Sequence, residues 1–177
     1  CTADRVGEVT GGGLVTKHES EALKSLGYSS KVWDRNKLQC TNEPWGWDED
    51  LRRRLVAYHN LELELSHFYS GTFSVTVKAL KDHGCKVTYT IAAHDREVSR
   101  REHEKLGIPF AQLYPHLVEP DLWQRYIEGY RLADVIICPS TVAARIVRAY
   151  GPEFGDKRIE VIPHGCNLPD RIVAFPT

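Results

Sequence analysis

Three contiguous glycines, Gly11, Gly12 and Gly13, are the first residues whose type and spacing could do chemistry. They precede residues 14–26, where apolar side chains recur at helical spacing, and Gly27 stands where a helix typically ends. Glycine has no Cβ, so its backbone can approach a phosphate closely. The amino end of a helix adds free N–H groups and a positive dipole. The cluster therefore predicts a contact with a phosphate or a sugar. A flexible turn before a helix is the alternative.

Two histidines lie at the ends of runs that are typical of strands. His94 comes directly after Lys86–Ala93, a largely apolar, β-branched run expected to be a strand buried on both faces. His67 lies at the end of an alternating run over residues 61–68. Open α/β sheets bind ligands at the carboxyl ends of their strands. The positions predict that both histidines face a ligand, with a structural core histidine as the alternative.

Asp95 and Ser140 stand directly before predicted helices, over 96–105 and 141–150. Both residue types cap helices by accepting a hydrogen bond from a backbone N–H. Each residue also follows a predicted strand, so each is a candidate for contact with a sugar or an acceptor. Capping is the competing interpretation, and for Asp95 it is the favoured one.

Two further groups are better explained by structure than by binding. Arg96, Arg100 and Arg101 are interleaved with glutamates, which indicates a solvated face with ion pairs. Trp45 and Trp47 could stack on a sugar, but they flank a glycine in a polar stretch, and such residues more often anchor a loop to the core.

These candidates need a scaffold of alternating strands and helices, and the rest of the chain supplies one. The pattern predicts strands, a loop over 34–48, and a helix over 48–59 with Asp48 as its N-cap. Alternation at short spacing indicates an α/β fold, with a parallel sheet and helices on both faces. The predicted strands are 31–33, 61–68, 86–93, 135–138 and 158–162, and the other predicted helices are 73–83 and one from Glu119-Pro120.

Composition limits the classes of function. The 177 residues fit one domain, and a formal net charge of −1 does not favour nucleic acid or an anionic membrane. No apolar run is long enough to span a bilayer, and no signal peptide is visible. The five cysteines show no zinc-finger spacing and are expected to be reduced thiols. We therefore expect a cytoplasmic protein.

Read together, four segments resemble the N-terminal domain of glycosyltransferase family 4, the retaining GT-B enzymes. They are the Gly11–Gly13 cluster with its helix, the strand ending at His94-Asp95, Ala133–Ser140, and Ile159–Asn167. The last two are the specific ones, because they match the family's "A-D-hydrophobic run-S" strand and its "V-I-P-N-G-V-D" strand. His164 and Asn167 depart from the second pattern, so contacts in the linker are expected to differ.

The resemblance implies a Rossmann-like domain over 1–165, with 166–177 beginning a linker to a C-terminal domain. It implies that His94 is catalytic and hydrogen-bonds the transferred sugar or the acceptor. It further implies a nucleotide-sugar donor, an unknown acceptor, and no cofactor or metal. The family's donor site uses two glutamates with seven residues between them, a spacing that this chain lacks. The chain alone is therefore expected to be catalytically silent, as half of a larger enzyme.

Two other interpretations stay open at this point. The chain could belong to a GT-B enzyme with different chemistry, such as a nucleotide-sugar epimerase or a glycogen-synthase-like transferase. It could also be a binding module that holds a sugar or nucleotide without turnover. A Rossmann dehydrogenase is disfavoured, because the glycines are contiguous rather than spaced as G-x-G-x-x-G.

Overall fold

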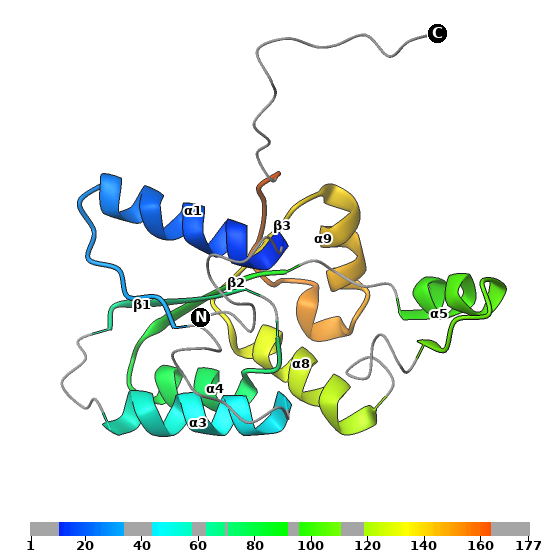
Figure 1. Cartoon of the computed structure of the whole chain (residues 1–177), viewed down its shortest axis with the longest axis horizontal. Helices are drawn as coiled ribbons and strands as arrows, with labels where there is room; N and C mark the ends of the chain where they lie inside the picture. Colours follow the sequence, from blue (N-terminus) through cyan, green and yellow to red (C-terminus); the bar gives the residue numbers. More distant parts are fainter. Residues whose placement is uncertain are drawn as a thin grey trace, which may run out of the picture.

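The computed structural model describes residues 11–33, 44–57, 63–69, 71–91, 96–110 and 119–163, and Figure 1 shows their arrangement. The helices are α1 (Gly11–Ser25), α3 (Pro44–Ala57), α4 (Ser74–Asp82), α5 (Arg96–Lys105), α8 (Pro120–Leu132), α9 (Thr141–Arg148) and the 3₁₀ helix η1 (Pro152–Phe154). The strands are β1 (Leu65–Tyr69), β2 (Lys86–Thr90), β3 (Val135–Cys138) and β4 (Ile159–Val161). Helices alternate with strands, as the sequence predicts.

The four described strands form one parallel sheet in the order β1-β2-β3-β4. Its register aligns Phe68 with Tyr89, and Tyr89 with Ile136. One position earlier, His67 aligns with Thr88. Successive residues of a strand point to opposite faces, so the two rows lie on opposite sides of the sheet.

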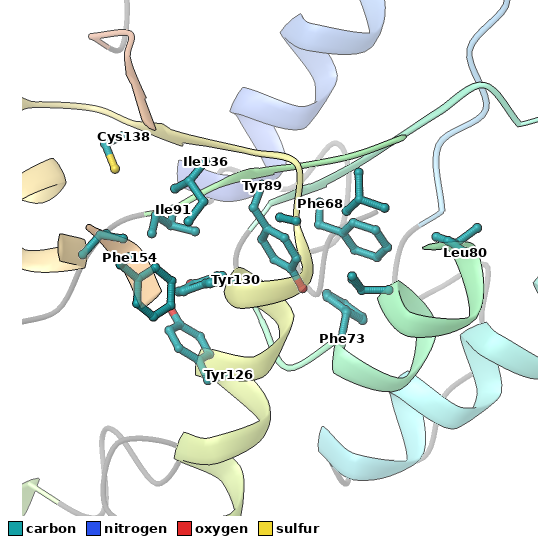
Figure 2. Close-up of a cluster of buried hydrophobic side chains, with 14 of the residues drawn as sticks. Phe68, Phe73, Leu80, Tyr89, Ile91, Tyr126, Tyr130, Ile136, Cys138 and Phe154 are labelled. Atoms are coloured by element: carbon teal, nitrogen blue, oxygen red, sulfur yellow. The ribbon is translucent and has the colours of Figure 1, made fainter. Parts of the chain in front are cut away.

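The row that contains Tyr89 lies in the apolar core, which α4 and α8 cover (Figure 2). The Phe68 ring stacks on Tyr89 with 5.1 Å between centroids, and Phe73 of the turn before α4 lies 5.3 Å from Phe68. Tyr130 of α8 meets Tyr89 edge-on at 5.0 Å. In Figure 1, α1 lies on the opposite side of the sheet from α3, α4 and α8. The predicted α/β class with helices on both faces is confirmed.

Glycines end several helices where the sequence predicts. Gly84 follows α4 with φ +78°, a left-handed conformation that favours glycine. Its N–H donates to the carbonyl of Lys81, and the Cys85 N–H donates to Leu80, which together form a Schellman motif. Gly27 ends α1 by the same pair of bonds, with φ +84°. Such local signals explain why these helix ends were predictable.

Other boundaries differ from the prediction. The helix predicted over 48–59 begins earlier, at Pro44, a residue type that suits a first turn because it needs no N–H there. The predicted loop over 34–48 is therefore wrong from Pro44 onward. The strand predicted over 61–68 runs from Leu65 to Tyr69. The predicted strand over 86–93 ends at Thr90, and its last two positions lie outside the described residues.

The strand predicted at residues 31–33 is wrong, because these residues lie in irregular structure. Trp33 instead packs against the apolar core, and the Lys31 Nζ lies 4.5 Å from the centroid of its ring. A β-branched and aromatic run can equally serve as an apolar anchor, which its propensity alone does not distinguish. None of the described helices is long and apolar enough to cross a membrane.

Candidate functional site

Gly11, Gly12 and Gly13 form the first turn of α1, not the loop that the sequence predicts before it. A first turn tolerates glycine because its N–H groups make no bond within the helix. In Figure 1 this end of α1 (dark blue) lies at the end of the sheet where β2 finishes. The glycine turn therefore brings N–H donors that make no bond within the helix, and the positive end of a 15-residue helix, to the carboxyl edge of the sheet. This arrangement can bind an anion.

His67 is the third residue of β1 and does not end it, because the strand continues to Tyr69. Its side chain turns toward α1. Nδ1 lies 2.8 Å from the Thr88 Oγ1 of β2, and Nε2 lies 3.4 Å from the Glu19 Oε2 of α1. The imidazole is 25% exposed. His67 therefore connects its own strand, β1, to both β2 and α1.

The side of α1 that faces the sheet is polar. Thr16 and Ser20 are buried, and Glu19 is half-buried. Ser20 Oγ lies 3.1 Å from Ser30 Oγ, in the segment that follows the helix. The spacing i, i+3, i+4 places all three α1 residues on one face. The helical pattern of the sequence predicted an apolar packed face that includes Leu23 and Leu26, and that prediction is wrong, because both side chains are exposed.

Ser140 caps α9, as one of the two predicted roles requires. Its Oγ accepts a hydrogen bond from the Ala143 N–H at 3.1 Å. A hydroxyl that accepts one bond can still donate its own proton. Ser140 comes two residues after the end of β3, so it lies near the carboxyl end of that strand. Capping therefore explains why a serine stands at this position, and it uses the hydroxyl oxygen but not the hydroxyl proton.

Asp134 precedes β3 and lies at the opposite, amino end of the strand. Its Oδ2 accepts from the Val87 N–H at 2.8 Å, and its Oδ1 accepts from the Lys81 Nζ at 2.6 Å. Burial tends to raise the pKa of Asp134, but these two hydrogen bonds and the Lys81 charge outweigh burial and lower it. The aspartate of the Ala133–Ser140 segment thus joins β2, α4 and β3, and its role is structural.

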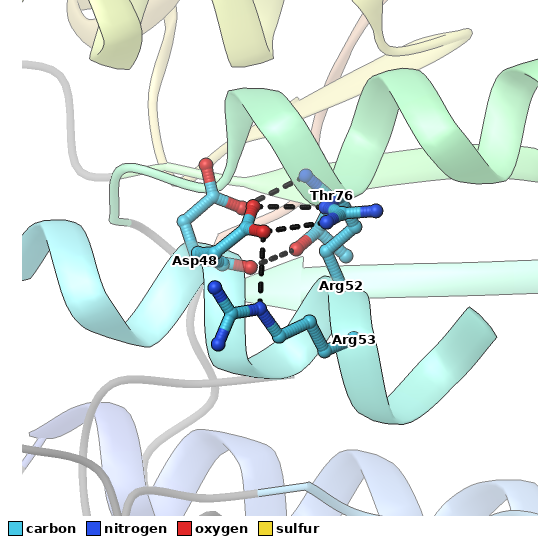
Figure 3. Close-up of polar contacts among 5 residues, drawn as sticks. Asp48, Arg52, Arg53 and Thr76 are labelled. Carbon is cyan, nitrogen blue, oxygen red and sulfur yellow. Dashed lines mark hydrogen bonds and ion pairs between the residues drawn. The ribbon is translucent and has the colours of Figure 1, made fainter. Parts of the chain in front are cut away.

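Asp48 caps a helix, but not the one predicted. It lies inside α3, and its two carboxylate oxygens accept from the Val75 and Thr76 N–H groups of α4, each at 2.8 Å. Figure 3 shows Asp48 beside Thr76. The Thr76 hydroxyl donates to the Asp48 carbonyl at 2.8 Å. Burial raises the pKa of Asp48, and the Thr76 and Val75 bonds oppose that rise. The prediction that Asp48 is the N-cap of its own helix is therefore wrong, because its carboxylate bonds to a helix whose Val75 lies 27 residues away in sequence.

Asp48 and Asp50 also have the spacing D-x-D, which two carboxylates holding a cation could share and which the sequence analysis passed over. The Asp48 carboxylate is occupied by α4. Glu49 between them binds Arg52 and Arg53, and the Arg52 bond lowers the Glu49 pKa to about 2. Among the described residues, no group of three or more His, Cys, Asp or Glu side chains could hold a metal ion.

The charged face predicted for residues 96–105 is confirmed in α5. Arg100 pairs with Glu104 one turn later, and Lys105 donates to Glu102 at 2.6 Å. Pairs of this kind are exposed and contribute little to stability. The predicted reduced thiols are also confirmed where described, since Cys85 and Cys138 are free and buried. Burial raises the pKa of Cys138 to about 11, as suits a small core residue.

Several predicted residues lie outside this description. His94 and Asp95 are not among the described residues, nor are 164–177, where the linker is predicted. Trp45 and Trp47 lie in the first turn of α3, and their side chains are not described. The predicted roles of these residues therefore stay predictions.

Comparison with known proteins gives one family. A family model described as Glycosyltransferase Family 4 matches residues 9–169, which span the glycine turn, all four strands and every described helix. No curated protein matches the chain.

Proposed function

The chain belongs to glycosyltransferase family 4, and from this premise we propose that it serves a sugar transfer from a nucleotide-sugar donor, with retention at the anomeric carbon. Membership of the family supports a glycosyltransferase-type function, and the donor type and stereochemistry are the proposal. The observation that carries it is the glycine turn of α1 at the carboxyl edge of a parallel sheet, within a segment that the family model matches.

In this proposal the first turn of α1 holds the diphosphate of the donor. Gly11, Gly12 and Gly13 let the oxygens come within hydrogen-bond reach of the backbone, since no Cβ stands in the way. The free N–H groups and the helix dipole stabilise the negative charge that grows as the nucleotide diphosphate leaves. The proposed site needs no metal or other cofactor.

The other candidates contact the sugar or the acceptor in this proposal. His94 is assigned the catalytic role by resemblance to the family, and Asp95 is assigned a binding role from its position after a predicted strand. Ser140 offers its hydroxyl proton to a sugar hydroxyl while it caps α9. His67 is proposed to bind sugar or acceptor from the middle of β1.

We further propose that a second domain completes the donor site. The paired glutamates of the family's donor site have no counterpart at the required spacing in these 177 residues. The chain should therefore bind a nucleotide diphosphate and leave a nucleotide-sugar intact. The proposed cytoplasmic location follows from the sequence alone.

The test of the phosphate site is Gly12→Asp. A carboxylate in the first turn of a helix interacts favourably with the dipole, so the melting temperature should stay the same or rise. The same carboxylate repels a diphosphate, so the Kd for uridine diphosphate or guanosine diphosphate should rise at least about tenfold. Isothermal titration calorimetry and thermal unfolding measure the two effects.

Thr141→Asp is the matched control, because it adds the same charge to the first turn of α9 at an exposed position. It should leave the Kd unchanged. Equal binding by wild type and Gly12→Asp would refute the phosphate site. Incubation with nucleotide-sugars and candidate acceptors should give no product, and turnover by the chain would refute the need for a second domain.

A further inference from the structure

The attachment of α1 to the sheet, as far as its described side chains show, lies outside the buried apolar core. Among the described residues, no α1 side chain belongs to the buried apolar cluster or packs against it. Its buried residues are Thr16 and Ser20. Two apolar residues of β3, Val135 and Ile137, lie on the sheet face beneath α1 and are half-buried. Polar contacts must therefore contribute to where α1 lies.

Among the described side chains, Glu19 of α1 and His67 of β1 form an ion pair over the middle of the sheet, and no hydrogen bond joins the Glu19 Oε2 to the His67 Nε2. The Glu19 carboxylate lies 3.4 Å from the His67 Nε2, and Nδ1 on the other side of the ring lies 2.8 Å from the Thr88 Oγ1. The Glu19 side chain is 36% exposed, so water screens this pair only in part. The ring is thus oriented by β2 and presents its other nitrogen to α1.

This contact acts on the glycine turn through the length of the helix. Gly11 precedes Glu19 by eight residues, about 12 Å at 1.5 Å per residue. In Figure 1, α1 begins at the carboxyl edge of the sheet and runs back across it, so later positions of the helix lie farther from that edge. A helix is stiff over this distance, and a displacement at Glu19 moves the glycine N–H groups. Placement errors of about 1 Å can cost about a hundredfold in rate.

We propose that Glu19 and His67 are positioning residues, which hold α1 against β1 and β2 so that its glycine turn meets the donor phosphate. This rests on the proposed phosphate site, and it replaces the sugar or acceptor contact proposed for His67 with a role that acts through the helix. Thr88 orients the imidazole ring of His67, and the Glu19 carboxylate lies against the other ring nitrogen. Both lie away from the ligand edge.

The variants are Glu19→Ala, which removes the contact, and Glu19→Gln, which keeps the size of the side chain and an oxygen at the same position while removing its charge. The matched control is Glu21→Ala. Glu21 lies two residues along α1, is 56% exposed, and pairs only with Lys17 and His18 of the same helix among the pairs described. The two positions remove the same charge from one helix, and only Glu19 faces the sheet.

The first measurement is hydrogen–deuterium exchange in the 177-residue chain. Glu19→Ala should raise the exchange rate of the α1 amides at least about fivefold, with α4 and α8 unchanged and Glu21→Ala like the wild type. The second is the Kd for uridine diphosphate at a temperature where every variant is fully folded. Glu19→Ala should raise the Kd at least about threefold, and Glu19→Gln should recover most of that loss.

Unchanged α1 exchange in Glu19→Ala, or an effect equal to that of Glu21→Ala, would overturn the proposal. Faster α1 exchange with an unchanged Kd would also overturn it, because the contact would then be structural only. If the wild type binds no nucleotide diphosphate, the phosphate site is refuted, and the positioning role is refuted with it. The exchange measurement still tests separately whether Glu19 and His67 hold α1 against the sheet.

Discussion

The face of the sheet beneath α4 and α8 is apolar, whereas the face beneath α1 is mostly polar. On the first, Phe68, Tyr89 and Ile136 are fully buried and lie in one aromatic and aliphatic cluster (Figure 2). On the second, the aligned pair His67 and Thr88 meets a carboxylate of α1. The same four parallel strands supply both faces by alternation.

This difference separates stability from placement. Burial of apolar surface is the main favourable term in folding, so the α4 and α8 face should carry most of the stability. Polar contacts have small net value but are directional, so they define where a helix lies. The helix with the polar attachment is also the one whose amino end is proposed to bind phosphate. The two faces should therefore respond differently to mutation.

Phe68→Ala should give the largest loss of stability. The side chain is fully buried and contacts two rings, so its removal leaves a cavity as well as lost apolar burial. We expect about 3–5 kcal/mol of destabilisation in chemical denaturation. His67→Ala, the neighbouring residue on the other face, should cost about 1–2 kcal/mol. Equal losses of stability in Phe68→Ala and His67→Ala would show that both faces of the sheet contribute equally to stability.

Asp134→Asn should cost about 1–2 kcal/mol at pH 7, because it removes the charge that pairs with Lys81 at the amino end of the sheet. The folded-state pKa of Asp134 is lowered, so its stabilisation is present above the ordinary carboxyl pKa of about 3.9. That stabilisation is lost as the pH falls below this value. Denaturation at pH 7 and at about pH 3 should therefore show a difference from wild type that shrinks in acid.

Asp156→Asn is the control for this prediction, since Asp156 is an exposed carboxylate in the turn before β4. It should leave the stability unchanged at both pH values. Nucleotide diphosphate binding by the Asp134→Asn variant should stay normal, because Asp134 lies at the end of β3 away from the glycine turn. Loss of binding without loss of stability would assign Asp134 a functional role.

Local patterns predicted most of the fold, and long-range contacts account for what they missed. The bounds of α5 and the carboxyl ends of α1 and α4 follow from residues within one or two turns, so the sequence predicted them. The Asp48 cap joins residues 27 apart, and the Glu19–His67 pair joins residues 48 apart, so no local pattern contains either partner. The glycine turn and Ser140 could be predicted as candidate binding residues, because each stands at the end of a predicted strand or helix.

The smallest effect should come from Thr90→Val, and it is the finest test of the difference between the faces. Thr90 is 3% exposed, and its hydroxyl has no hydrogen-bond partner among the described residues. Thr76 of α4 is also buried, but its hydroxyl donates to the Asp48 carbonyl at 2.8 Å.

Valine has nearly the shape of threonine without the hydroxyl, so each substitution isolates one polar group. Thr76→Val should cost about 1–2 kcal/mol, because it breaks a made bond and leaves the carbonyl with one partner fewer. Thr90→Val should be neutral or stabilising by up to about 1 kcal/mol, since it removes a buried hydroxyl without a described partner from a strand that favours valine. Chemical denaturation of both variants measures the contrast. A loss of more than about 1 kcal/mol in Thr90→Val would mean that the hydroxyl beneath α1 serves stability, and the two faces would then differ less than their chemistry indicates.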